Sequence, residues 1–125
     1  MEKETGMQIA VCCPNAEEAE RISRIIGERA ALACKNAETA AFSSEEALWR
    51  AFAPGRFFGA VIGWGDAKGF LCARRVREED RACRVILLDD TDRYAIRGLR
   101  IHLTDYLVRP LGEARLRAAV DRLFI

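Results

Sequence analysis

The chain has 125 residues, half of them hydrophobic, which suits one domain that buries a core without disulfides or a metal and excludes a disordered chain. Its 20 basic and 19 acidic residues nearly cancel, so the net charge of +1 predicts no sequence-independent attraction to nucleic acid. No run is long and apolar enough to span a bilayer, and the start lacks a secretory apolar stretch, so we expect a cytoplasmic protein without membrane contact.

The first half of the chain begins with a short apolar run, residues 7–13, which predicts a buried strand closed by Pro14. Asn15 then predicts a helix cap, with Glu18 completing a capping-box-like pair. The helix has one apolar face, formed by Ala19, Ile22, Ile26 and Ala30.

A weaker strand, residues 39–42, precedes a second capping signature formed by Ser43 and Glu46. Pro54-Gly55 ends the helix that follows, and residues 57–62 predict a fully buried third strand. We expect a loop over residues 63–69 and a helix that starts at Phe70 and ends in the charged stretch 78–80.

The second half contains the clearest strand, residues 85–88, with Asp89-Asp90 at its end. Residues 94–99 predict a helix, and residues 106–108 predict a short strand stopped by Pro110. The last helix has an apolar face made of Leu116, Ala119, Val120 and Leu123.

Five strand–helix units with apolar strands predict an α/β fold with helices on both faces of a parallel sheet. The commonest arrangement of five units is the flavodoxin-like three-layer sandwich, with strand order 2-1-3-4-5 and five helices. In that arrangement ligands bind beyond the carboxyl ends of the strands. The residues at those ends are Cys13, Pro14, Gly63, Trp64, Asp89 and Arg109.

Four stretches of the second half carry a resemblance to a known family: residues 73–78, 85–89, 92–96 and 105–110, the last reading Asp-Tyr-Leu-Val-Arg-Pro. They resemble the CheY-like receiver domains of bacterial response regulators, and in particular those of LytTR-class transcription regulators. Residues 9–12 are similar to the first strand of such receivers. We therefore expect residues 1–6 to be an N-terminal extension and residues 7–125 to be a receiver-like domain.

The resemblance implies a phosphorylation pocket whose residues have been replaced. Active receivers hold Mg²⁺ with two acidic residues after the first strand and an acceptor aspartate after the third, and a Thr or Ser and a Lys contact the phosphoryl oxygens. Here Cys13 and Pro14 stand at the acidic pair, Trp64 at the acceptor, Asp89 at the Thr or Ser and Arg109 at the Lys. We expect a degenerate two-component module that is no enzyme and takes no metal or cofactor. Arg109 should pair with Asp89 as an internal substitute for the phosphate contact.

Several alternatives stay open at this pocket. Asp66 and Asp90 could join Asp89 in a displaced acidic site that still accepts a phosphoryl group. The glycines of residues 63–69 resemble a nucleotide-binding loop, although their spacing departs from the dinucleotide fingerprint. Trp64 either plugs the vacated pocket or stacks on a small ligand there.

Five cysteines raise the question of zinc or disulfides, but no C-x-x-C pair exists and there is a single histidine. We interpret the thiols as small buried groups in a reducing compartment.

The resemblance also implies partners. A LytTR-type DNA-binding output domain would follow Ile125, so we expect DNA contact through that domain alone, and the apolar end of this chain suggests an excised piece. Receivers commonly form homodimers through the fourth helix, fifth strand and fifth helix. That face would carry Arg97, Arg100, Asp105 and Arg122.

Overall fold

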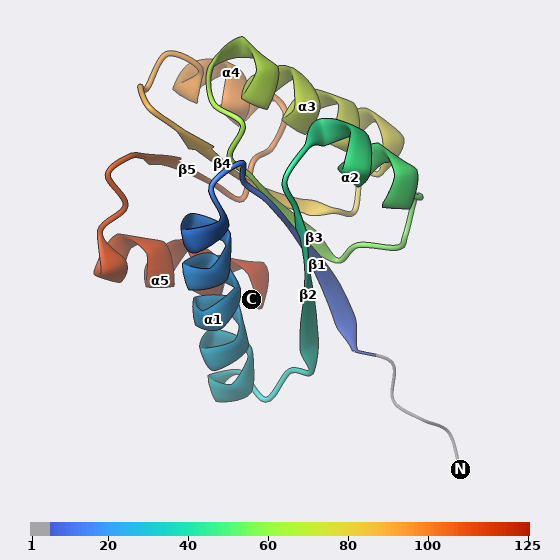
Figure 1. Cartoon of the computed structure of the whole chain (residues 1–125), viewed down its shortest axis with the longest axis vertical. Coiled ribbons are helices and arrows are strands. Elements are labelled where there is room, and N and C mark those ends of the chain that lie inside the picture. Colours follow the sequence, from blue (N-terminus) through green and yellow to red (C-terminus); the bar gives the residue numbers. More distant parts are fainter. Residues whose placement is uncertain (1–5) are drawn as a thin grey trace.

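The computed structural model describes residues 6–125, so five of the six residues of the expected N-terminal extension lie outside it. Strands and helices alternate along the whole described chain (Figure 1). In chain order they are β1 (Met7–Cys12), α1 (Ala16–Leu32), β2 (Ala37–Phe42), α2 (Glu45–Ala51), β3 (Gly59–Ile62), α3 (Asp66–Glu79), β4 (Arg84–Asp89), α4 (Ala95–Arg100), β5 (Asp105–Val108) and α5 (Glu113–Leu123). Within these residues no helix is long and apolar enough to cross a membrane.

The five strands form one parallel sheet in the order β2-β1-β3-β4-β5, which confirms the predicted flavodoxin-like topology. Helices α1 and α5 cover one face, and α2, α3 and α4 cover the other (Figure 1). The order reverses between β1 and β3, so the carboxyl ends of the strands are the expected place for a binding site.

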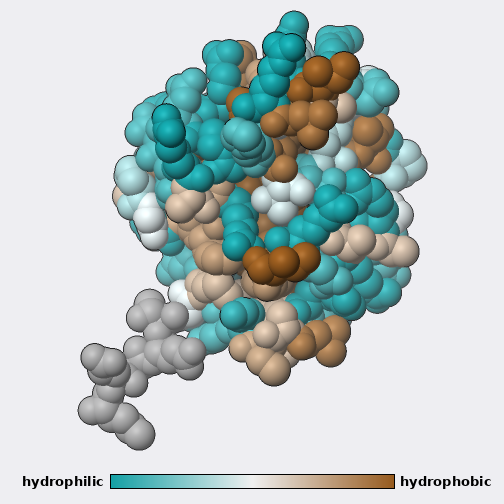
Figure 2. Space-filling view, turned by 180° about the vertical axis from the view of Figure 1, so that it is seen from behind, coloured by the Kyte–Doolittle hydropathy of each residue, from teal (hydrophilic) through white to brown (hydrophobic). Residues whose placement is uncertain are grey.

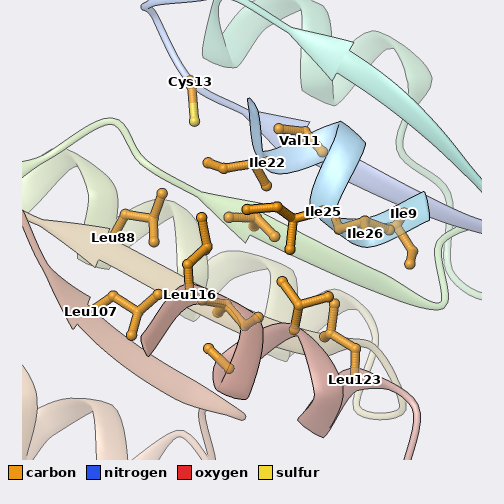
Figure 3. Packing of buried hydrophobic residues seen from close by; sticks show 14 of the residues in the cluster. Ile9, Val11, Cys13, Ile22, Ile25, Ile26, Leu88, Leu107, Leu116 and Leu123 are labelled. Atoms are coloured by element: carbon orange, nitrogen blue, oxygen red, sulfur yellow. The ribbon is translucent and has the colours of Figure 1, made fainter. Parts of the chain in front are cut away.

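The two faces of the sheet bury different kinds of side chain. The face under α1 and α5 is aliphatic, and Figure 3 shows Ile22 and Ile25 of α1 facing Leu116 of α5. The predicted apolar face of α1 is confirmed, and Ile25 belongs to it as well. The opposite face is rich in aromatic rings and sulfur, with members that include Cys12, Phe57, Phe70, Cys72 and Tyr94.

Four of the five cysteines are buried and all are free thiols, as the sequence suggested, but Cys34 is exposed just after α1. Burial raises the pKa of Cys72 and Cys83 to about 12. These thiols therefore stay protonated at neutral pH, when a thiol is a poor nucleophile and a poor metal ligand.

Two local predictions were wrong and one was confirmed. Asn15 caps α1 as expected, accepting the backbone N–H of Glu18 at 2.9 Å. The cap of α2 is Ser44 instead of Ser43, because the Ser44 hydroxyl accepts the backbone N–H of Ala47 at 3.2 Å.

The helix predicted from Phe70 begins earlier, at Asp66, so the expected loop over residues 63–69 shrinks to Gly63–Gly65. Gly65 has φ +82°, a conformation that glycine adopts without strain, and turns the chain straight into α3. The Gly65 carbonyl then accepts the N–H of Gly69 at 3.0 Å. A turn of helix therefore occupies most of the segment that resembled a nucleotide-binding loop.

Candidate functional site

The carboxyl ends of β1, β3, β4 and β5 bring the predicted pocket residues together. The backbone N–H of Gly63 donates to the Cys12 carbonyl at 2.7 Å, and that of Arg109 donates to the Asp89 carbonyl at 2.8 Å. The missing side chain of Gly63 leaves room for two neighbours, because a Cβ at this position would lie 2.8 Å from Nη2 of Arg109 and 3.1 Å from Sγ of Cys13. A hollow of about 530 Å³ opens beside this point, lined by Pro14, Asn15, Glu17, Glu18, Arg21, Gly63, Trp64, Asp90 and Arg109.

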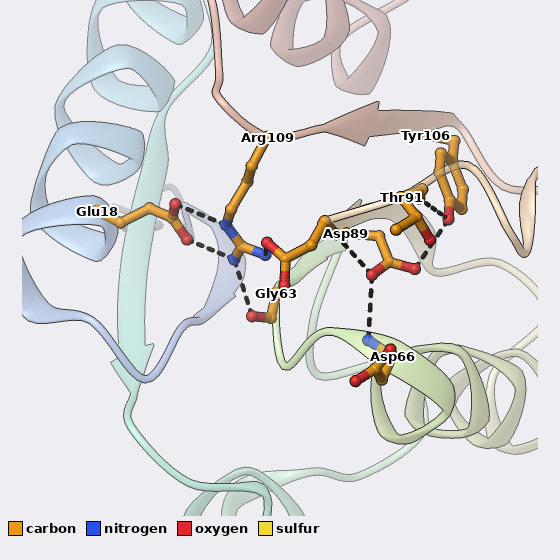
Figure 4. A network of polar contacts seen from close by, with 8 residues as sticks. Glu18, Gly63, Asp66, Asp89, Thr91, Tyr106 and Arg109 are labelled. Carbon is orange, nitrogen blue, oxygen red and sulfur yellow. Dashed lines mark hydrogen bonds and ion pairs between the residues drawn. The ribbon is translucent and has the colours of Figure 1, made fainter.

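Arg109 pairs with Glu18 of α1, so the predicted pairing with Asp89 is wrong (Figure 4). Its Nε lies 2.9 Å and its Nη2 2.6 Å from the two carboxylate oxygens of Glu18, and Nη2 also donates to the Gly63 carbonyl at 2.9 Å. A weaker contact of 3.5 Å reaches Asp90. Glu18 lies in the first turn of α1, the helix that follows β1. Its carboxylate faces the guanidinium of Arg109, whereas the carboxylate of Asp89 points away from that guanidinium.

The sequence pattern indicates Glu18 only as the second half of a capping box. Its carboxylate instead serves Arg109, and the hydrogen bond from that guanidinium lowers the pKa of Glu18. The same hydrogen bond raises the pKa of Arg109. These two shifts keep both groups charged at neutral pH, and because both side chains are largely shielded from solvent, salt screens the pair poorly.

Cys13 is buried directly beneath this ion pair. Burial, followed by the charge of Glu18, raises the pKa of Cys13 to about 12. The thiol is therefore protonated under ordinary conditions. Pro14 is exposed at the rim of the hollow and has no side-chain oxygen or nitrogen to offer.

Within residues 6–125, Asp89 is the one buried residue with a charged side chain, at 2% exposure, and its carboxylate is fully engaged by its own chain. It accepts the backbone N–H groups of Asp66 at 3.1 Å and Asp90 at 2.7 Å, and the hydroxyl of Tyr106 at 2.9 Å (Figure 4). The Tyr106 hydroxyl also lies 2.7 Å from the Thr91 carbonyl. Burial and the bond to Asp89 raise the pKa of Tyr106 to about 12. This cluster ties α3, β4, the loop after β4 and β5 together.

The expected displaced acidic site involved Asp66 and Asp90 beside Asp89. The structure places all three close together, but Asp66 contributes its backbone N–H while its side chain is exposed. Asp90 is exposed and faces Arg109. Among residues 6–125, no group of three or more His, Cys, Asp or Glu side chains is arranged to hold a metal ion.

The Trp64 side chain packs against the core and also lines the pocket. It packs against the aromatic and sulfur-rich core, and its indole N–H donates to Sγ of Cys72 at 3.3 Å. It also lines the hollow beside Arg109. The pocket is therefore only partly filled by the indole.

The four residues predicted for a dimer face separate into two pairs. Asp105 contacts Arg115 at 2.7 Å and Arg122 at 3.8 Å, and lies with Arg122 in a hollow bounded by α4, β5 and α5. Burial raises the pKa of Asp105, but hydrogen bonds from Arg115 and from a backbone N–H outweigh it, and the net shift is downward. Arg97 and Arg100 lie on the side of α4 that faces α3.

Comparison with known proteins supports the architecture through structure alone, since no family model and no curated protein matches the chain. A response regulator receiver domain protein from Clostridium thermocellum superposes with a TM-score of 0.75 at 18% identity, covering 94% of each chain. The receiver domain of AraT, a response regulator from Geobacillus stearothermophilus, gives 0.74 at 20% identity over 96% of this chain and 94% of its own. The response regulator DrrB from Thermotoga maritima gives 0.72 at 20% identity over 94% of this chain, which spans only 52% of DrrB. The chain has the fold of response regulator receiver domains.

Proposed function

We propose that this receiver-fold domain is a regulatory module that works without phosphorylation. The observation that carries the proposal is the ion pair between Arg109 and Glu18, which engages the guanidinium at the position where a receiver lysine would contact a phosphoryl group. A fixed carboxylate of the same chain takes the place of an incoming anion. Such a pair forms within the chain and needs no phosphodonor.

The chemistry of the other pocket residues supports the same reading. Mg²⁺ requires oxygen ligands, and receivers supply them from the positions now held by Cys13, Pro14 and Trp64. A buried protonated thiol, a proline and an indole offer none. Asp89 has carboxylate oxygens, but three hydrogen bonds already occupy them.

The direct experiment is incubation of the chain with acetyl phosphate and millimolar Mg²⁺, followed by intact-mass and peptide mass spectrometry. We expect no phosphoryl adduct and no Mg²⁺-dependent change in the amide spectrum. A stable adduct on Asp66, Asp89 or Asp90 would overturn the proposal and establish the displaced acidic site instead.

For the output, we propose a LytTR-type DNA-binding domain joined to this module in a longer protein, with homodimerisation through α4, β5 and α5. Ile96 and Leu99 are 72% and 76% exposed on this face, beside the ion pairs of Asp105. Exposed apolar side chains next to charges are typical of a weak interface. Sedimentation should show a dimer that loosens as salt rises, because exposed charges are screened within about 8 Å at physiological ionic strength. A monomer at high concentration and low salt would contradict this.

A second candidate function, sensing of a small ligand, is favoured by the hollow of about 530 Å³ beside Trp64. An indole wall with arginine nearby suits an aromatic or anionic compound. A screen of small molecules by NMR would follow the indole N–H signals, with Trp49 on α2 as the internal control. Compounds that shift only the Trp64 signal would support a sensor. If no compound shifts it at millimolar concentration, Trp64 has only a packing role.

A further inference from the structure

We propose that the groove between α3 and α4 is a docking site for an acidic amphipathic helix of a partner protein. The groove lies outside the phosphorylation pocket and on the side of α4 away from the proposed dimer face. The inference therefore goes beyond the proposed function and does not depend on it.

The floor of the groove is apolar and aromatic. The rings of Phe70 and Tyr94 are both buried and stack with centroids 5.1 Å apart and planes 11° from parallel. Ala67, Ile101 and Leu71, the last 48% exposed, complete the apolar lining of a hollow of about 370 Å³. An exposed leucine above a stacked aromatic floor gives a partner's apolar side chains a surface to bury.

The rim of the groove is basic. Arg74 projects from α3, and Arg97 and Arg100 project from α4; none of the described residues that line this hollow is acidic. Within residues 6–125, Arg97 and Arg100 form no ion pair, and Arg74 reaches only Glu78 at 3.8 Å between two exposed side chains. By contrast, Arg29 and Arg115 each hold a carboxylate with two short hydrogen bonds. Three guanidinium groups are thus available for a partner's carboxylates.

The groove continues along the two helices. Arg100 and Ile101 also line a neighbouring hollow, which adds Arg81 and His102 on the basic side and Glu78 as its acidic residue. Figure 2 shows hydrophobic side chains set among hydrophilic ones at the end of the molecule where α3 and α4 lie. The apolar floor lies in the first hollow, and the arginines extend along both hollows. This arrangement matches a helix that has apolar residues at positions i, i+3 and i+4 and carboxylates beside them.

Arginine on the rim favours carboxylates, because its planar guanidinium binds them through two parallel hydrogen bonds. A nucleic acid would meet the same positive charges, but its phosphates would leave the strip of Phe70, Leu71 and Ile101 without an apolar partner. The chain as a whole is nearly neutral, so its general electrostatic attraction for a polyanion is small. Both features favour an acidic protein helix as the occupant.

The experiment is a selection from a displayed library of helical peptides of about 20 residues on the full chain, with a duplex DNA of about 20 base pairs tested in parallel. The groove variant combines Arg74→Glu, Arg97→Glu and Arg100→Glu. The matched control combines Arg24→Glu, Arg50→Glu and Arg117→Glu, which changes net charge equally at exposed positions on α1, α2 and α5. Melting curves check that both variants fold, and Leu71→Ala tests the apolar strip without altering charge.

We expect enriched peptides with acidic residues beside an apolar stripe, which bind the groove variant at least roughly tenfold more weakly than the control variant. Leu71→Ala should also weaken them, and their binding should fall with salt. Peptides that bind both triple variants alike, or a selection that enriches no acidic sequence, would overturn the proposal. DNA binding that only the groove variant loses, without peptide enrichment, would overturn it in favour of a nucleic-acid surface.

Discussion

Two polar clusters lie at the same edge of the sheet and are built in opposite ways. Asp89 is buried and is held by backbone N–H groups and a tyrosine hydroxyl, all neutral donors. Arg109 and Glu18 are both charged and border a hollow open to solvent. A buried charge depends on every donor that replaced water, whereas a partly hydrated ion pair can fall back on solvent. Breaking the Asp89 cluster should therefore cost more folding stability than breaking the pair of Arg109 and Glu18.

Asp89→Leu should reduce the free energy of unfolding more than any other substitution at this edge of the sheet. A smaller reduction would contradict the contrast between the two clusters. The substitution leaves the N–H groups of Asp66 and Asp90 without their acceptor, and the Tyr106 hydroxyl keeps only the Thr91 carbonyl. We expect about 4 kcal/mol of destabilisation, or roughly 15 °C in Tm, measured by urea and thermal denaturation. Asp89→Asn, which retains an acceptor oxygen, is the control and should lose about half as much. Equal losses for the two variants would show that the hydrogen bonds are not the source.

Trp64→Asp should rank second and tests whether the pocket lacks only its acceptor. The indole packs against the aromatic core and bonds to Cys72, so we expect about 2–3 kcal/mol of destabilisation. No Mg²⁺-dependent phosphorylation should appear. Adding Cys13→Asp and Pro14→Asp should destabilise the chain further, because position 13 is buried beside Glu18. Efficient phosphorylation of the single variant would mean that the apparatus is intact apart from its acceptor.

Arg109→Met removes the cation of the partly buried ion pair while keeping the length of the side chain. Glu18 then loses its partner but can still reach water through the hollow, so we expect about 2 kcal/mol, less than for Asp89→Leu. Arg109→Lys should recover part of this through charge alone. If Arg109→Met lost more stability than Asp89→Leu, the ion pair and not the Asp89 cluster would be the more important one for folding.

The pH dependence of stability sharpens the comparison. The pKa of Glu18 lies below its ordinary value of 4.5, so its contribution is present above that pH and is lost as pH falls through the lowered value. The stability difference between the wild type and Glu18→Gln should be about 1 kcal/mol at pH 7 and vanish towards pH 2. Urea denaturation at several pH values measures it. A difference that does not change down to pH 2 would exclude the ion pair as its cause.

The reactivity of the cysteine thiols measures how well the Glu18–Arg109 pair shields Cys13, without any change in stability. Cys13 lies beneath the ion pair with its pKa raised to about 12, and Cys34 is exposed. At pH 8 a disulfide reagent should modify Cys34 alone in the folded chain, and Cys34→Ser should abolish rapid modification. Rapid reaction of Cys13 in Cys34→Ser would show that the Glu18–Arg109 cluster opens often in solution.

The order of elements and the sheet topology could be predicted from the sequence, because most strands are short apolar runs and the longer helices repeat their apolar residues at helical spacing. The pocket could be located for the same reason, since parallel strands end at one edge. The sequence was less informative about which single residue caps a helix. Ser43 and Ser44 are adjacent and chemically identical, so only the backbone decides that Ser44 caps α2.

The partners within the pocket depended on the tertiary structure. Glu18 and Arg109 are 91 residues apart, and their pairing follows from the direction in which α1 leaves β1 and from the place of β5 in the sheet. Asp89 is nearer in sequence to Arg109 and ends the neighbouring strand, yet its carboxylate faces Tyr106 and α3. Local sequence sets which face of a strand or helix a side chain occupies. Which carboxylate meets which donor across several elements is decided only when those elements pack together.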